Sequence, residues 1–257
     1  MFSLRALFAI GVALASCLFG LSAQAQSQGG GQYCSPTGAL VIFAVDITTP
    51  YDQTDKSVIV GMTDKILGNL RGGDRLVVRT IGDSHTHSER LIERCVPYCA
   101  ANGSLDRLFN CSDGAIRTDA ERMRLEVVGA LRNRLSKFEE LKHSDIVRTI
   151  HSIASEEARD GRPLKLFIYS DLVENSDYFS PRYLFSYSTQ RLIDGLKIYK
   201  LIAPLRDAEI VVAGLGRWDG SDRRALTVAE LNKLKEFWGA YFKESGANSV
   251  TMSLNPP

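Results

Sequence analysis

The sequence predicts a doubly wound α/β fold, in which a mostly parallel central sheet is flanked by helices. Two observations carry this prediction. Strand-like segments alternate with amphipathic helical segments, which is the pattern of βαβ units and of a parallel sheet covered on both faces. The first strand-like segment, residues 39–46, is apolar until its final position, Asp46. An uninterrupted apolar run is typical of a strand that is buried on both faces.

The next elements follow from hydrophobic periodicity. A helix is expected over residues 51–70, where apolar residues recur every four positions ahead of a Gly-Gly pair. A second strand is expected over 74–81. The residues at 118–121 form a capping box that opens a long amphipathic helix. Ser144 is expected to cap the following helix, and residues 164–170 read as the third clear strand.

The last part of the chain continues the alternation. Residues 175–187 are rich in Ser, Tyr and Pro and are expected to form an irregular loop. A helix is expected over 190–201 and a buried strand over 208–215. A second capping box at 227–230 opens a helix with an aromatic stripe, which is typical of a core-facing helix. Residues 249–254 are predicted to form a strand at the edge of the sheet.

The first 25 residues have the features of an export signal: Arg5, an apolar core and a small-x-small cleavage site. Cleavage would leave a flexible leader, 26–38, and a domain over 39–257. The apolar run is short for a membrane span, so we expect a periplasmic or secreted protein. The alternative is a lipoprotein, since the signal also contains a lipobox-like sequence that would place a lipid anchor on Cys17.

Residues 84–113 interrupt the strand–helix alternation, and we expect a surface insertion held by a disulfide. This segment contains three of the four cysteines that remain after cleavage. The four are Cys34, Cys95, Cys99 and Cys111. An even number of cysteines in an exported protein favours disulfides, although the sequence leaves three pairings open. A zinc cluster of these cysteines with His85 and His87 is the alternative.

The charge balance argues against nucleic acid as a partner. The chain has 31 basic and 30 acidic residues, and loss of Arg5 with the signal makes the two numbers equal. No basic tract is present, so we expect no nucleic-acid binding. The sequence Gly82-Asp83-Ser84 resembles an esterase nucleophile block, but the last histidine is His151 and no imidazole base follows it. We therefore expect no enzyme activity.

Polar side chains stand at corresponding ends of the predicted strands. Asp46 and Thr48 follow the first strand, and Asp171 follows the strand at 164–170. Ser144 precedes a helix on the same side of the predicted sheet. Ligand sites of open α/β sheets form at the carboxyl ends of the strands, where these side chains would converge. Carboxylate and hydroxyl oxygens suit Mg²⁺ or another hard divalent cation.

The order of these residues resembles the metal-ion-dependent adhesion site of von Willebrand factor A domains. Asp46 and Thr48 match the first two places of the Asp-x-Ser-x-Ser motif of that family. Ser144 stands for a later Thr and Asp171 for a late Asp, while Pro50 occupies the place of the third hydroxyl. The strand–helix order extends the resemblance over most of the mature chain. The resemblance implies a binding domain that presents a divalent cation to an acidic side chain of a protein partner.

Two further classes of function stay open. Because Pro50 offers neither a hydroxyl nor an N–H, the domain could instead be a metal-independent structural or adaptor domain of the cell envelope. An envelope hydrolase would require that a base lie close in space to Asp83 and Ser84.

Overall fold

The computed structural model describes residues 33–48, 50–99, 112–137, 141–157, 161–216 and 225–253. The predicted signal peptide, Cys17, most of the leader and Cys111 lie outside the described residues. Among the helices of the described part, none is both long enough and apolar enough to cross a bilayer.

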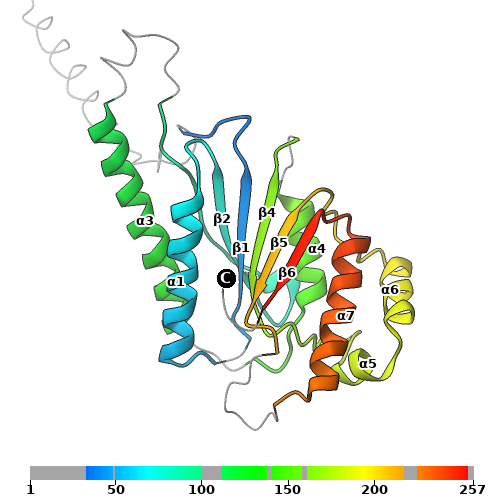
Figure 1. Cartoon of the computed structure of the whole chain (residues 1–257). Coiled ribbons are helices and arrows are strands. Elements are labelled where there is room, and N and C mark those ends of the chain that lie inside the picture. Colours follow the sequence, from blue (N-terminus) through cyan, green and yellow to red (C-terminus); the bar gives the residue numbers. More distant parts are fainter. Residues whose placement is uncertain are drawn as a thin grey trace, which may run out of the picture.

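The described chain forms an α/β fold around one six-stranded sheet, as predicted (Figure 1). The strands are β1 (Leu40–Asp46), β2 (Arg75–Ile81), β3 (Arg90–Cys95), β4 (Leu164–Tyr169), β5 (Glu209–Ala213) and β6 (Ser249–Met252). Their order in the sheet is β3-β2-β1-β4-β5-β6, and only the β2–β3 pair is antiparallel. The strand order reverses between β1 and β4, and such a switch point leaves a crevice outside the carboxyl ends of the strands.

Helices cover both faces of this sheet (Figure 1). They are α1 (Gln53–Asn69), α3 (Asp113–Ser136), α4 (Ile146–Glu156), α5 (Pro181–Ser186), α6 (Thr189–Ile198) and α7 (Val228–Glu244), with a 3₁₀ turn η1 (His85–His87). Side chains from α1 and α3 share a core with one face of β1, and those from α4, α6 and α7 share a core with the other. Successive residues of β1, such as Ile42 and Phe43, enter opposite cores, which explains why the strand has no polar face.

Three predicted segments differ from the structure. Residues 90–95, within the predicted insertion, form the antiparallel edge strand β3. The strand was missed because three of its six residues are charged and its two aliphatic residues are adjacent instead of alternating with polar ones. Ion pairs accommodate these charges, since Arg90 pairs with Glu157, directly after α4, and Arg94 pairs with Glu126 of α3.

The helix expected to start at the 118–121 capping box starts five residues earlier. Ser112 caps α3 by accepting a hydrogen bond from the Ala115 N–H, and the Thr118 hydroxyl donates to the Gly114 carbonyl inside the helix. The 175–187 segment is also not fully irregular. It contains α5, which has Pro181 in its first turn, a position where proline needs no N–H partner.

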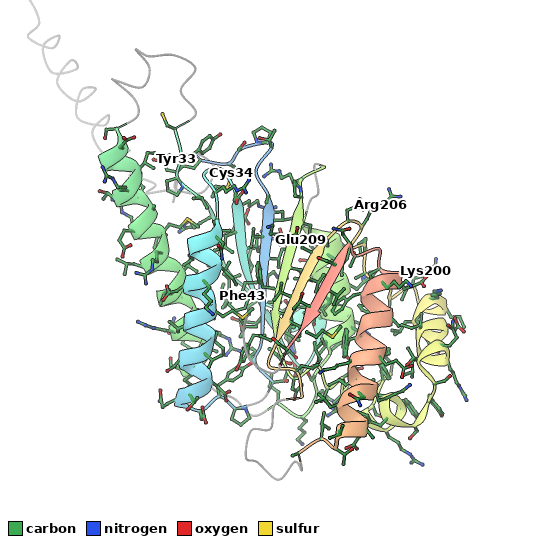
Figure 2. The ribbon with its side chains drawn as sticks, in the orientation of Figure 1. Tyr33, Cys34, Phe43, Lys200, Arg206 and Glu209 are labelled. Atoms are coloured by element: carbon green, nitrogen blue, oxygen red, sulfur yellow. A yellow bond between two sulfur atoms is a disulfide. The ribbon has the colours of Figure 1, made fainter. Side chains whose placement is uncertain are left out.

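Cys34 forms a disulfide with Cys95, and Cys99 is also disulfide-bonded. The disulfide prediction is therefore confirmed for these residues, and the zinc alternative loses Cys95 and Cys99 as thiolate ligands. Figure 2 places Cys34 at the end of the sheet where β1 begins, away from the end that carries the predicted site. The disulfide joins the segment before β1 to the edge strand.

The aromatic stripe of α7 belongs to the core, as predicted. Phe237, Trp238 and Tyr241 are fully buried, and the indole N–H of Trp238 donates to the Leu172 carbonyl at 2.8 Å. Leu172 is itself fully buried and has a left-handed backbone, with φ of 58°. The α7 core therefore fixes the loop that follows β4, and this loop carries part of the candidate site.

Candidate functional site

The candidate site lies at the switch point of the sheet, where β1 and β4 end side by side. Asp46 is the last residue of β1, and Ser170 directly follows β4. β1 and β4 are paired up to the Val45–Tyr169 position, so the two residues that follow this pair leave the sheet together. Figure 1 shows both strands ending at the same edge of the sheet.

Asp46 accepts three hydrogen bonds in this crevice. One carboxylate oxygen accepts from the Thr48 N–H at 2.9 Å and from the Thr48 hydroxyl at 2.7 Å. The other oxygen accepts from the Ser170 hydroxyl at 2.6 Å. The bond to the N–H two residues later is an Asx turn, which is why an Asp-x-Thr sequence folds back on itself here. Asp46 and Thr48 are therefore in direct contact.

Ser144 lies beside Thr48, with its hydroxyl oxygen 3.1 Å from that of Thr48. The backbone holds it in place, since its N–H and carbonyl pair with those of Asn175 at 2.9 and 3.0 Å. We refer to Asp46, Thr48, Ser144 and Ser170 as the strand-end cluster. All four residues are at most 5% exposed.

The prediction that Ser144 caps a helix is wrong. The helix α4 starts at Ile146, and its N-cap residue, Asp145, makes no side-chain capping bond. The carboxylate of Glu174 takes this role, because one of its oxygens accepts from the N–H groups of Ile146 and Val147, both at 2.9 Å. A side chain from a distant loop thus satisfies the free N–H groups of the helix start.

Asp171 is buried next to the cluster, but its described contacts lead elsewhere. Its carboxylate accepts from the Val173 N–H at 2.8 Å, and its carbonyl accepts from the Gly216 N–H at 2.9 Å. The residue of this loop that hydrogen-bonds Asp46 is the preceding Ser170, which the sequence reasoning missed. A signal was present, since a hydroxyl stands at the predicted end of the strand.

Glu174 is the most perturbed acid near the site. It is completely buried, and burial raises its pKa to about 8, with the neighbouring charge of Asp145 adding to this rise. Asp145 accepts from the Tyr178 hydroxyl at 3.1 Å and from the His85 N–H at 3.2 Å. Burial also raises the pKa of Tyr178 above its ordinary range.

The strand-end cluster and Asp171 offer two carboxylates and three hydroxyls, and these oxygens are of the kind that Mg²⁺ prefers. The supply of free lone pairs is limited, because Asp46 already uses three of about four acceptor positions. In the part of the chain that the structure describes, no group of three or more His, Cys, Asp or Glu side chains is arranged to hold a metal ion. The oxygens that are present therefore fit a hard divalent cation that keeps several water molecules as ligands.

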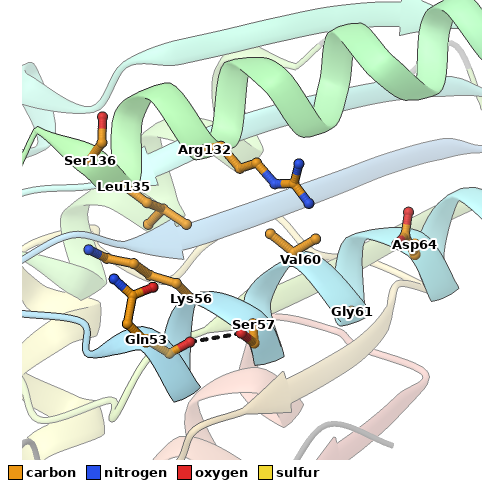
Figure 3. A pocket seen from close by; sticks show the side chains of 9 residues that line it. All are labelled: Gln53, Lys56, Ser57, Val60, Gly61, Asp64, Arg132, Leu135 and Ser136. Carbon is orange, nitrogen blue, oxygen red and sulfur yellow. Dashed lines mark hydrogen bonds between the residues drawn. The ribbon is translucent and has the colours of Figure 1, made fainter.

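A separate groove of about 580 Å³ runs between α1 and α3 (Figure 3). Lys56 and Val60 of α1 face Arg132 and Leu135 of α3 across it. None of the predicted site residues lines this groove, so it is distinct from the strand-end cluster.

The nucleophile-like Ser84 is engaged in a local turn. Its hydroxyl caps η1 and lies 2.9 Å from the Thr86 hydroxyl, while the His87 imidazole pairs with Asp83 at 2.7 Å. Within the described ranges Ser84 has no hydrogen bond to an imidazole. This geometry gives the hydrolase alternative no support.

No protein-family model and no curated protein matches the chain. Among solved structures, it is similar to proximal thread matrix protein 1 of the mussel byssus, with 11% identity, a TM-score of 0.39, and coverage of 85% of this chain and 42% of that one. It is similar to the pilus adhesin SpaC of Lactobacillus rhamnosus GG, with 11% identity, a TM-score of 0.38, and coverage of 87% and 29%. It is also similar to a von Willebrand factor type A protein of Catenulispora acidiphila, with 9% identity, a TM-score of 0.28, and coverage of 82% and 43%.

The chain thus spans less than half the length of these structures. All three similarities are weak, and they assign the chain to no family.

Proposed function

We propose that this chain is an exported binding domain of the cell envelope that recognises a protein partner at the carboxyl end of its sheet. In this proposal the domain is doubly wound in the manner of a von Willebrand factor A domain. Asp46, Thr48, Ser144 and Asp171 would hold Mg²⁺ or another divalent cation, directly or through water. The cation would supply an open coordination position for an acidic side chain of the partner.

The single observation that carries the proposal is the strand-end cluster. Three segments far apart in sequence, which carry Asp46 with Thr48, Ser144 and Ser170, meet in hydrogen-bond contact at the switch point of the sheet. This is the position at which open α/β sheets bind ligands. The disulfide between Cys34 and Cys95 supports export, because such bonds persist in oxidising compartments.

The second candidate function is a metal-independent adaptor domain, and the saturation of Asp46 favours it. A carboxylate that already accepts three hydrogen bonds has little to gain from a cation. Under this alternative the cluster would serve only to hold the loops that contact the partner.

Calorimetric titration of the purified protein with MgCl₂ and MnCl₂ tests the first candidate. The informative variant is Thr48→Val, which removes the hydroxyl between Asp46 and Ser144 and keeps the shape of the side chain. The matched control is Thr63→Val, because Thr63 is equally buried but bonds the Ile59 carbonyl within α1. We expect saturable heat for the wild type, at least about tenfold weaker binding for Thr48→Val, corresponding to about 1.4 kcal/mol, and no change for Thr63→Val.

Absence of heat from the wild type, or equal affinities in Thr48→Val and wild type, would overturn the cation part of the proposal. The binding part is tested by capturing envelope proteins on the immobilised domain. Capture that is lost in Thr48→Val and in chelator, but kept in Thr63→Val, is the expected result. Capture unchanged by chelator would instead favour the adaptor function.

A further inference from the structure

A cavity of about 360 Å³ on the outer side of α4 brings together basic groups that the proposed function does not use. We refer to it as the α4 cavity. It is lined by His85, Arg148, His151, Ser152, Ser155, Glu156 and Leu201. Five of these lie on α4, at positions 148, 151, 152, 155 and 156, while His85 comes from η1 and Leu201 follows α6.

Arg148 brings a positive charge that makes no ion pair with a carboxylate of the described residues. Its guanidinium carbon lies 3.9 Å from the centre of the Tyr178 ring, so the side chain is held by a cation–π contact. Within the described part of the chain it has no ion pair and no hydrogen bond to an acid. An aromatic ring orients a guanidinium but leaves its N–H donors available for an anion.

The two histidines add imidazole groups from two different elements. Nδ1 of His85 is buried without a hydrogen-bond partner among the described residues, and it lies 3.5 Å from a carboxylate oxygen of Asp145. Burial, together with the charge of His85, lowers the pKa of His151. The α4 cavity therefore contains an imidazole, that of His151, whose protonation is opposed by its surroundings. A bound anion would favour this protonation.

Glu156 is the one acid among the described residues that line the cavity, and its charge is already paired. Its carboxylate accepts from Arg79 at 2.6 Å and from the Ser152 hydroxyl. It therefore opposes an anion less than a free carboxylate would. The remaining hydroxyl donor is that of Ser155, in the last turn of α4.

We propose that the α4 cavity is a binding site for an oxyanion of the phosphate or carboxylate class. Arg148 supplies the fixed charge and a planar set of N–H donors. His151 and His85 supply imidazole N–H donors from two different elements. The proposal is independent of the strand-end cluster, because none of the cluster residues lines this cavity.

Binding at this site should strengthen as pH falls. Among the described residues, the titratable and charged groups around His151 are His85 from η1, and Arg148 and Glu156 from α4. Behind them lie Asp145, 3.5 Å from His85, and Arg79 of β2, which pairs with Glu156. An anion stabilises the protonated imidazole, so binding takes up a proton. By linkage, the uptake of one proton tightens binding by up to about tenfold per pH unit as the pH falls.

Nuclear magnetic resonance of the histidine side chains tests the site directly, because the chain has four histidines. The probes are inorganic sulfate, whose charge stays constant between about pH 6 and pH 7.5, and sodium acetate at matched ionic strength. We expect saturable shifts of the His85 and His151 resonances, with His87 and His143 unchanged as internal controls. A response to sulfate alone assigns a phosphate-type ligand, and a response to acetate alone assigns a carboxylate.

Arg148→Gln should weaken sulfate binding at least about tenfold, by about 1.4 kcal/mol. The matched control is Arg191→Gln, since Arg191 also stacks on a tyrosine, Tyr187, at 4.2 Å but outside the cavity. His151→Asn provides a second variant that leaves the cation–π contact intact and should remove most of the pH dependence. Shifts that do not saturate and are equal in all four histidines, or equal affinities in Arg148→Gln and Arg191→Gln, would overturn the proposal.

Discussion

Replacing Glu174 by Gln is expected to stabilise the protein at neutral pH, even though Glu174 makes two hydrogen bonds. The carboxylate is completely buried and accepts from the N–H groups of Ile146 and Val147. Those bonds favour the ionised acid, but burial opposes it more strongly, and the pKa rises from 4.5 to about 8. A Gln side chain keeps the accepting oxygen and cannot ionise.

The size of the effect follows from the pKa shift. At about 1.4 kcal/mol per unit, the shift means that ionising Glu174 costs about 5 kcal/mol more in the folded than in the unfolded protein. Between pH 4.5 and about pH 8, the folded state keeps a proton that the unfolded chain has released. Wild-type stability therefore falls as pH rises through this window, whereas Glu174→Gln lacks this loss. The stability difference should grow by about 1.4 kcal/mol per pH unit, to about 3 kcal/mol at pH 7 relative to pH 4.5.

Urea unfolding at a series of pH values, with the disulfides intact, measures this difference as a shift of the midpoint at constant slope. Glu157→Gln is the matched control. Glu157 is 1% exposed but accepts from Arg75 and Arg90, both at 2.8 Å. Removing its charge takes one carboxylate partner from Arg75 and Arg90, which both stay paired with Glu93, so this variant should be less stable than wild type by about 1.5–3 kcal/mol.

A stability difference between Glu174→Gln and wild type that does not change with pH would refute the reasoning. So would a Glu174→Gln protein that is less stable than wild type at pH 8. Either result would mean that the two helix N–H groups, and not burial, decide the ionisation of Glu174.

Two further changes test what stabilises the fold at the two ends of the sheet. Replacing both Cys34 and Cys95 by Ala should lower the free energy of unfolding by about 4 kcal/mol, since the disulfide closes a loop with a sequence separation of 61. An unchanged urea midpoint would contradict this. Trp238→Phe should cost about 2–4 kcal/mol, because it leaves the buried Leu172 carbonyl without its indole donor and opens a cavity. Circular dichroism during urea unfolding measures the loss, and a wild-type midpoint would show that the indole bond is dispensable.

The sheet could be predicted because burial on two faces leaves a strong pattern in the sequence. The apolar runs that became β1, β4 and β5 were recognised within one or two residues. The edge strand β3 was missed for the opposite reason. Its charged side chains are stabilised by ion pairs with α3 and with Glu157, and these pairs come from chain segments that sequence patterns do not connect.

The candidate site was predicted in part. Asp46 and Thr48 form a local turn, so adjacent residues carry the signal. Ser144 was placed in the correct crevice but given the wrong role, because a Ser before a helix usually caps it. The capping group here is Glu174, and nothing in the local sequence shows that a side chain 28 residues away will fill that role.

The arrangement of the strand-end cluster also constrains how a cation could act there. Any ion that binds Asp46 must replace hydrogen bonds from Thr48 or Ser170. Because one set of contacts is exchanged for another, the net gain in binding free energy is small. Pro50 supplies no further hydroxyl to increase that gain. A carboxylate from a partner would add a charged ligand that the protein lacks, so cation and partner should bind with positive coupling. We therefore expect the cation to bind weakly in the absence of partner. An increase in cation affinity when the partner is added would indicate a shared site, and an unchanged affinity would indicate two independent sites.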